Sequence, residues 1–446
     1  MDAPLNNERL TRPSIFRGTP VDAQANIPNA PTPLFLLIII GVVIRLVVNP
    51  AIVAQFYDYT TPGGLFLRHV HPGSYLLLIA GALSFRKVLS RTPKRANPLF
   101  WAAISLMLAC VAGVFLNVIR GNGGVTFVVD SLFVAPVSLF AIANLSIRQQ
   151  SLIGHILIAI ILMNGGVSIV EMMLHRQILP EVHADVGYFG IDNIFRPKGL
   201  FGHPLATGVI ATAAMPTIFI LVRDFLWKWI FVILMAVSVA IAQARVATIA
   251  SALILVMLAV LSLNKDIKSG VVSARTVVVA LTFSALIIPA IIWALYSTGR
   301  FERLLMGTND DNSAAARVVI YDIFNFMTPS EFYWGMHIDR ATMLANSFLH
   351  IDSFESVVVV FVLAFGVYFT IVFIPLIYYF VISISLGSSL YVKVSVIIYL
   401  ILASTNNALA TAGPDLTIVT ALAFIAAVRY RWCGDNYPPL ARLAGR

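Results

Sequence analysis

Long hydrophobic runs alternate with short polar segments along almost the whole chain, and this pattern predicts an all-α protein that crosses a membrane many times. A helix needs roughly 17–25 mostly apolar residues to cross a bilayer. Twelve runs approach or reach that length, although two of them, 65–85 and 411–430, do so only by including polar residues. The predicted spans are 32–49, 65–85, 99–118, 125–145, 151–170, 203–222, 225–243, 245–263, 276–296, 354–382, 390–405 and 411–430.

Composition supports the same class. Of the 446 residues, 59% are hydrophobic and only 11% are charged, whereas a soluble domain carries about 25% charged residues. Two cysteines exclude a disulfide scaffold. The net charge of +9 does not by itself indicate nucleic acid, because Lys and Arg in a membrane protein first set its orientation. We therefore expect an integral membrane protein with no nucleic-acid partner.

The distribution of basic residues predicts the orientation. With twelve spans both termini share a side, and 19 of the 30 Lys and Arg residues then fall on that side. Short basic loops mark the cytoplasm, so we expect a multi-pass inner-membrane protein of bacterial type with both termini cytoplasmic. Residues 1–30 are predicted to be a disordered cytoplasmic tail, residues 31–430 a single transmembrane domain, and residues 431–446 a second cytoplasmic tail.

Two long polar loops, 171–203 and 297–352, are predicted on the periplasmic side. Of the ten basic residues that this topology places outside, nine are arginine, and seven of the ten lie in these two loops. Seven of the eight histidines are also outside. Because arginine binds phosphate groups in a bidentate manner, the loops are candidates for the two halves of an active site that meets an anionic substrate.

The segment 195–204 is the first candidate. Its sequence Phe-Arg-Pro-Lys-Gly-Leu-Phe-Gly-His-Pro places Arg196 and Lys198 just before a predicted helix that begins at Pro204. Helix N-termini favour anions, and glycines allow close approach of the backbone. Arg245 lies in a very short outer turn and is a second candidate. For both, contact with lipid headgroups is the alternative interpretation.

The large loop contributes two further candidates. The stretch 312–323 is predicted to be helical, with Arg317 and Tyr321 on one face because they are four residues apart. Near the end of the loop, His350 precedes Asp352 and Glu355, whose spacing resembles a capping box that would begin the next helix at Asp352. A histidine at a water-facing position is a candidate general base, and a hydrogen-bonded structural histidine is the alternative.

Taken together, these residues resemble the O-antigen ligase and Wzy-type polysaccharide polymerase superfamily. Arg196 to Pro204 is similar to the family's arginine, glycine, aromatic and His-Pro sequence, and Arg245 resembles the arginine of its Ser-Arg-Gly turn, with Ala244 and Val246 in the flanking places. Arg317 and His350 resemble an arginine and a histidine of the family's large periplasmic loop, although Ile351 stands where the family has Asn.

The resemblance implies a GT-C-like fold and metal-independent, inverting glycosyl transfer from undecaprenyl-diphosphate-linked glycans, with no cofactor and no metal. It implies that His350 is catalytic and that Arg196, Arg245 and Arg317 bind the pyrophosphate. Further substrate-binding candidates are Arg176, Lys198, His203, Arg300 and Tyr321. The implied partners are the lipid-linked donor and acceptor and membrane lipids, and candidate protein partners are a chain-length regulator and a flippase.

Three functions remain open from the sequence. A polymerase would join lipid-linked repeat units into exopolysaccharide or O-antigen. A ligase would transfer finished glycan to the lipid A core, which is anionic, and the net charge of −3 on the loop 297–352 disfavours it. A lipid-linked oligosaccharide transporter or flippase is the alternative of another class. The absence of an internal repeat and the few ionisable residues within the spans count against it.

Overall fold

A computed structural model of the chain describes residues 30–56, 69–91, 97–122, 126–179, 195–268, 318–349, 354, 356–406 and 408–433. Within these ranges every regular element is a helix, which confirms the all-α prediction for this part of the chain. The longer elements are α2 (Thr32–Val47), α4 (Pro72–Arg91), α5 (Pro98–Arg120), α6 (Val134–Ala143), α7 (Ile147–Leu174), α8 (Pro204–Leu221), α9 (Phe225–Ile241), α10 (Arg245–Lys268), α17 (Val357–Phe365), α18 (Val367–Ser385), α19 (Leu390–Ser404) and α20 (Asp415–Cys433). The short elements are α3 (Pro50–Ala54), η2 (Val128–Phe133), η4 (Ile320–Phe326), α15 (Pro329–Trp334), α16 (Ile338–Leu344), η5 (Ala345–Leu349) and η6 (Ala408–Ala410).

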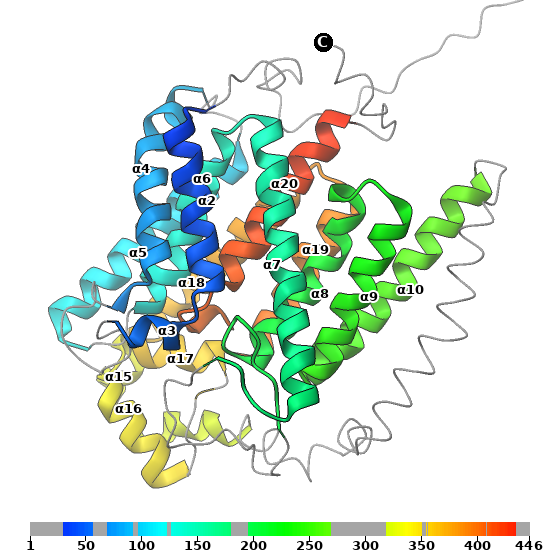
Figure 1. Ribbon diagram of the computed structural model, residues 1–446. Helices are drawn as coiled ribbons and strands as arrows, with labels where there is room; N and C mark the ends of the chain where they lie inside the picture. Colours follow the sequence, from blue (N-terminus) through cyan, green and yellow to red (C-terminus); the bar gives the residue numbers. More distant parts are fainter. Residues whose placement is uncertain are drawn as a thin grey trace, which may run out of the picture.

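Five of the described helices are long and apolar enough to cross a bilayer: α5, α7, α8, α10 and α18. Shorter apolar helices are α2, α9, α19 and the continuous segment formed by η2 and α6. The helices pack into a bundle in which α7, α8, α9 and α10 run alternately in opposite directions (Figure 1). The chain is therefore an α-helical protein with the character of a membrane protein.

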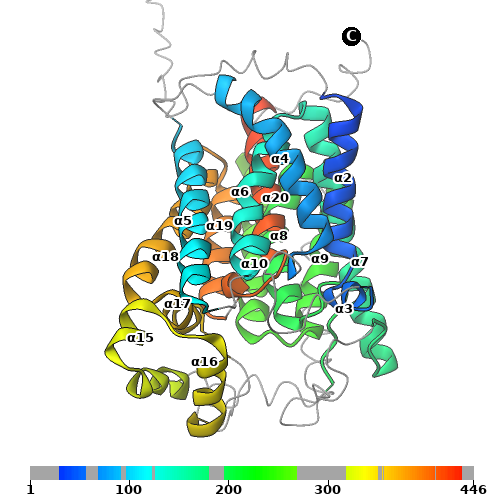
Figure 2. The ribbon, with the colours of Figure 1, turned by 90° about the vertical axis from the view of Figure 1, so that its left-hand side faces the viewer.

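At one end of the bundle α7 and α9 end and α8, α10 and α20 begin, and we call this end the loop face. The small helices α15 and α16 lie beyond the bundle at the loop face (Figure 2). At the opposite end α2 begins and α20 ends, so the first and last described helices share a side (Figure 1).

Helix α8 lies at the centre of the bundle, since nearly all of its residues are buried. It contacts α9, α10, α19 and α20. At Gly208 a Cβ atom would lie 2.7 Å from the Cβ of Ala244, so α8 approaches the turn before α10 with little space for side chains. Small residues at such contacts are how membrane helices pack closely.

The helix boundaries differ from the prediction in several places. α4 begins only at Pro72, so His69 and His71 precede the helix, and it continues to Arg91, into the predicted inner loop. α7 extends through Leu174 into the predicted loop 171–203. α20 extends to Cys433, beyond the predicted end of the transmembrane domain at residue 430. The predicted span 276–296 and the N-terminal tail up to residue 29 lie outside the described residues.

The predicted span 354–382 is divided into two helices at Gly366. The backbone there has φ +81°, and a Cβ atom would lie 2.2 Å from the carbonyl oxygen of Tyr333. The break therefore accommodates the end of α15, which packs directly on the backbone of the bundle. The predicted helix start at Asp352 is also wrong, because α17 begins at Val357 with Ser356 as its N-cap, the Ser356 side chain accepting from the N–H of Val359.

The loop segment 318–349 is fastened to the bundle by backbone hydrogen bonds. The N–H of Met336 donates to the carbonyl of Leu363 at 2.7 Å, and the N–H of Ile338 donates to the carbonyl of Asn122 at 3.2 Å. Arg120, the last residue of α5, donates to the carbonyl of Trp334 and stacks on its ring at 5.1 Å. These contacts hold α15 and α16 against the loop face.

Candidate functional site

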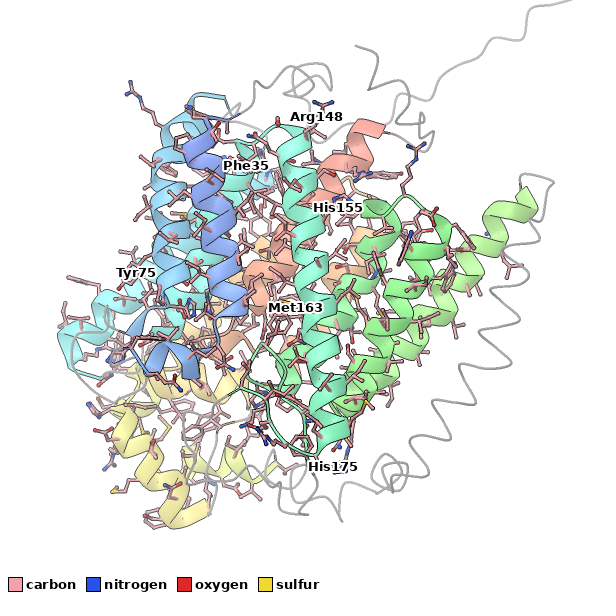
Figure 3. The ribbon with its side chains drawn as sticks, in the orientation of Figure 1. Phe35, Tyr75, Arg148, His155, Met163 and His175 are labelled. Carbon is pink, nitrogen blue, oxygen red and sulfur yellow. The ribbon has the colours of Figure 1, made fainter. Side chains whose placement is uncertain are left out.

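Helix α7 brings one side of the candidate site to the loop face. Figure 3 shows it running from Arg148, at the opposite end of the bundle, to His175 at the loop face. The helix ends where His175 adopts a left-handed conformation with φ 47°. The segment Phe195–His203 then leads into α8, and the ring of Phe195 lies 6.3 Å from that of His175.

Glu171, near the end of α7, organises this segment. Its side chain is buried, and one carboxylate oxygen accepts from the N–H groups of Lys198 and Gly199, both at 2.9 Å. The other oxygen accepts from the N–H of Ile178 at 3.1 Å. A carboxylate that accepts three backbone hydrogen bonds is a strong local anchor, because bonds to a charged acceptor are stronger than neutral ones. Glu171 therefore fixes the backbone on both sides of the connection between α7 and α8.

Asn164 and Ser168 continue the same polar face of α7. The Asn164 side chain accepts from the N–H of Phe201 at 3.1 Å and donates to the hydroxyl of Thr207 at 3.1 Å. At Gly199, where φ is +60°, a Cβ atom would lie 2.5 Å from the Asn164 side-chain oxygen and 2.6 Å from the Ser168 hydroxyl. Glycine is required there by both conformation and space, so the segment lies directly against α7.

The turn between α9 and α10 meets the segment from the other side. Gln243 adopts φ 56°, and its side-chain amide donates to the carbonyl of Phe195 at 3.3 Å. In return the Arg196 guanidinium donates to the carbonyl of Gln243 at 3.5 Å. Arg245 is two residues further on and begins α10. Gln243 thus holds Arg196 and Arg245, which are far apart in the sequence, on one patch of the loop face.

His203 is the N-cap of α8. Its Nδ1 accepts from the N–H of Leu205 at 3.2 Å. His203 is exposed to solvent, and the surrounding protein atoms first, and then the positive charges of Arg196 and Lys198, lower its pKa from the usual value. An accepting Nδ1 requires an unprotonated nitrogen, so the geometry and the pKa agree that His203 is neutral at physiological pH.

The arrangement is suited to an anion. Arg196, Lys198 and Arg245 gather where α8 begins, and the helix dipole adds partial positive charge at that point. All three side chains are half-buried, which strengthens their electrostatic effect relative to full solvent exposure. The site offers guanidinium groups with fixed backbones and a neutral imidazole.

The structure brings together only some of the predicted site residues. Arg196, Lys198, His203 and Arg245 share the patch described above. Arg176 is exposed just after the end of α7. Tyr321 lies elsewhere, in the short helix η4, where its hydroxyl contacts the hydroxyl of Ser356 at 3.1 Å. The remaining candidates, Arg300, Arg317 and His350, lie outside the described residues.

Three residues that build the patch were not predicted from the sequence: Asn164, Glu171 and Gln243. A signal for the first two was present, since Asn164, Ser168 and Glu171 follow one another at intervals of four and three residues and so share one face of a helix. A polar stripe inside an apolar span indicates burial against a polar partner. The sequence around Gln243 contains no pattern that indicates its role, because that role depends on the position of the distant residue Phe195.

The site and the fold define the class of protein only broadly, as an α-helical membrane protein with an anion-compatible patch at its loop face. Comparison of the chain with protein-family models, with curated proteins and with solved structures finds no match. In the part of the chain that the structure describes, no group of three or more His, Cys, Asp or Glu residues is arranged to hold a metal ion.

Proposed function

We propose that the protein is a polysaccharide polymerase that joins undecaprenyl-diphosphate-linked repeat units into exopolysaccharide or O-antigen. The observation that supports this most directly is the pairing of Arg196 and Arg245 on one patch through Gln243. The family resemblance supplies the substrate class. In this proposal the loop face is periplasmic, the chain crosses the inner membrane twelve times including residues 276–296, and the fold is GT-C-like.

The proposed chemistry concentrates charge on the leaving group. An acceptor hydroxyl attacks the anomeric carbon of the donor sugar, the bond from that carbon to the diphosphate oxygen breaks, and the lipid diphosphate departs with the electron pair. Arg196, Arg245 and Arg317 stabilise the developing charge. His350 accepts the proton of the hydroxyl, and the configuration at the anomeric carbon inverts. Arginine serves this role without a metal because its guanidinium stays ionised.

Complementation in the native host tests the proposal. Arg196→Ala and His350→Ala should each give normal membrane abundance, no polymer, and accumulated lipid-linked single repeats. Arg148→Ala, at the opposite end of α7, is the matched arginine control and should leave polymer unchanged. Wild-type polymer from both site variants would refute the proposed site. Long lipid-linked polymer that fails to reach lipid A would instead identify a ligase.

One observation favours the transporter as the second candidate. Arg45 and Asp130 form an ion pair inside the bundle, with side chains 1% and 0% exposed, and buried charges of this kind are common on transport paths. Movement of a lipid-linked oligosaccharide across proteoliposomes by the purified protein, without bond formation, would establish that function and exclude the polymerase.

A further inference from the structure

A second polar cluster lies inside the bundle close to the loop face. Arg45, near the end of α2, pairs with Asp130 of η2 at 3.1 Å. The other oxygen of Asp130 accepts from the hydroxyl of Ser74 at 2.5 Å and from the N–H of His71 at 3.2 Å. Asp130 is thus surrounded by donors, which is the environment of an ionised carboxylate.

The same cluster holds the connection between α19 and α20. Arg45 donates to the carbonyl of Ala412 at 3.1 Å. The hydroxyl of Ser131 donates to the carbonyls of Thr411 and Gly413 at 2.7 and 2.8 Å. Asp130, which pairs with Arg45, and Ser131, which binds the turn 411–413, are neighbours in the π-helical turn η2. Such turns occur frequently at functional sites.

Asp415, the first residue of α20, follows this turn and is 2% exposed. One of its carboxylate oxygens is buried and makes no hydrogen bond within the described part of the chain, and the same holds for the hydroxyl of Tyr399. Arg45 and Tyr399 both interact electrostatically with Asp415. Asp415 is therefore a buried carboxyl group without the donors that surround Asp130.

The charges in this cluster do not balance if every group is ionised. Arg45 stays protonated, and it neutralises Asp130, so an ionised Asp415 would add one uncompensated negative charge. The free-energy cost of burying an ion without a counter-charge is larger than the stabilisation that a helix N-terminus gives to a negative charge. This difference favours a neutral Asp415.

We propose that this cluster is a buried proton-binding site in which Asp415 binds the proton. Loss of that proton would place an uncompensated charge beside the turn 411–413. The site is separate from the arginine patch and does not depend on glycosyl transfer.

The helices that pack on α20 differ in the titratable groups they carry. α6 and α8 contain none, whereas α7 carries Arg148, His155 and Glu171, and α19 carries Tyr391, Lys393 and Tyr399. Tyr378 of α18 reaches Tyr399 electrostatically and its hydroxyl contacts the hydroxyl of Ser404 at 2.5 Å. His71 has Nε2 2.9 Å from the carbonyl of Val48 and accepts at Nδ1 from the N–H of Gly73. This pattern holds His71 as a neutral tautomer, so it does not balance the charge.

Thermal unfolding of the full chain in nanodiscs tests the charge assignment. Asp415→Asn should melt within a few degrees of the wild type, because it replaces a neutral acid by a neutral amide. Asp130→Asn should melt about 5 °C or more lower, because Arg45 loses its counter-charge. Equal destabilisation by both variants, or destabilisation by Asp415→Asn alone, would overturn the proposal.

Two double variants give an independent readout. Arg45→Met with Asp130→Asn removes both charges and should melt higher than either single variant. Arg45→Met with Asp415→Asn leaves Asp130 ionised and unpaired and should melt as low as Arg45→Met alone. The reverse order would show that Asp415 is the ionised partner of Arg45 and would refute the proton site.

Infrared spectroscopy detects the proton itself. The wild type should show a carboxylic acid carbonyl band that shifts on exchange into D₂O, persists in Asp130→Asn and is lost in Asp415→Asn. A band that is unchanged in Asp415→Asn would contradict the assignment. Stabilisation of the wild type by Na⁺ at constant pH and ionic strength, with no acid band, would indicate a cation in place of the proton.

Discussion

Two buried carboxylates at the loop face, Glu171 and Asp130, hold neighbouring structures by different means. Glu171 accepts from three backbone N–H groups and shapes the segment that carries Arg196 and Lys198. Asp130 pairs with the side chain of Arg45, which is almost entirely buried. Glu171 therefore orders a backbone segment, while the cationic side chains of Arg196 and Lys198 remain half-exposed. Asp130 instead neutralises the charge of Arg45 in the interior.

The difference shows that burial decides what an arginine can do in this protein. Arg45 has its guanidinium committed to Asp130 and to a backbone carbonyl, so we expect it to support the fold. Arg196 and Arg245 lie at the surface of the bundle beside a helix N-terminus, where an aqueous or lipid-linked anion can reach them. The comparison can be tested by treating the two regions with identical substitutions.

The largest effect is expected when the two arginines are compared. Arg45→Met leaves Asp130 buried without a counter-charge and should destabilise the protein by about 3–5 kcal/mol, with a matching loss of protein from the membrane. Arg196→Met should preserve abundance and thermal stability but abolish polymer formation. Thermal unfolding in detergent and a polymer gel distinguish these outcomes, and equal loss of stability in both variants would contradict the comparison.

A smaller effect is expected at the carboxylate that shapes the segment. Glu171→Gln places an amide NH₂ group against at least one backbone donor and should cost about 1–3 kcal/mol. Glu331→Gln is the matched control, since Glu331 pairs with Arg340 and completes the capping box of α15 near the surface. That change should cost less than about 1 kcal/mol. Similar losses in the two variants would argue against a special role for Glu171.

Alanine substitutions at two glycines with similar backbone conformations distinguish the cost of backbone strain from the cost of steric overlap. Gly121→Ala, at φ +67° with open space around it, should cost about 1 kcal/mol from the conformation alone. Gly199→Ala adds overlap with the Asn164 and Ser168 side chains and should cost about 2–3 kcal/mol. Differential scanning fluorimetry of both variants measures the difference in stability. Equal losses of stability would mean that the side chains of α7 move aside without a measurable loss of free energy.

The smallest expected effect is on pH dependence. Because folding lowers the pKa of the exposed His203 side chain below 6.5, the unfolded chain takes up a proton below about pH 6.5 that the folded chain does not. The wild type should therefore lose stability as pH falls below about 6.5, relative to His203→Asn, which keeps an N-cap acceptor. His337→Asn, at the N-cap of α16, controls for the substitution. Parallel melting curves for the wild type and His203→Asn would contradict the prediction.

Much of the helical framework could be predicted from local patterns. The apolar runs located α2, α5, α7, α8, α9, α10 and α19 to within a few residues, because a lipid-facing helix must be apolar along its length. The start of α8 at Pro204 was also predictable, since proline suits the first helical turn. The predicted boundaries were wrong where a tertiary contact interrupts a continuous apolar run. At Gly366, for example, the helix is broken because the end of α15 packs against the backbone of the bundle.

The chain by itself therefore determined which segments are helical and which arginines stand beside a helix start, because these properties depend on residues close in sequence. Only the tertiary structure decided which polar groups meet. Glu171 with Gly199, Gln243 with Phe195, and Arg45 with Asp130 are pairs separated by 28, 48 and 85 residues. Each pair forms because packing of distant helices leaves a buried polar group that must find a partner.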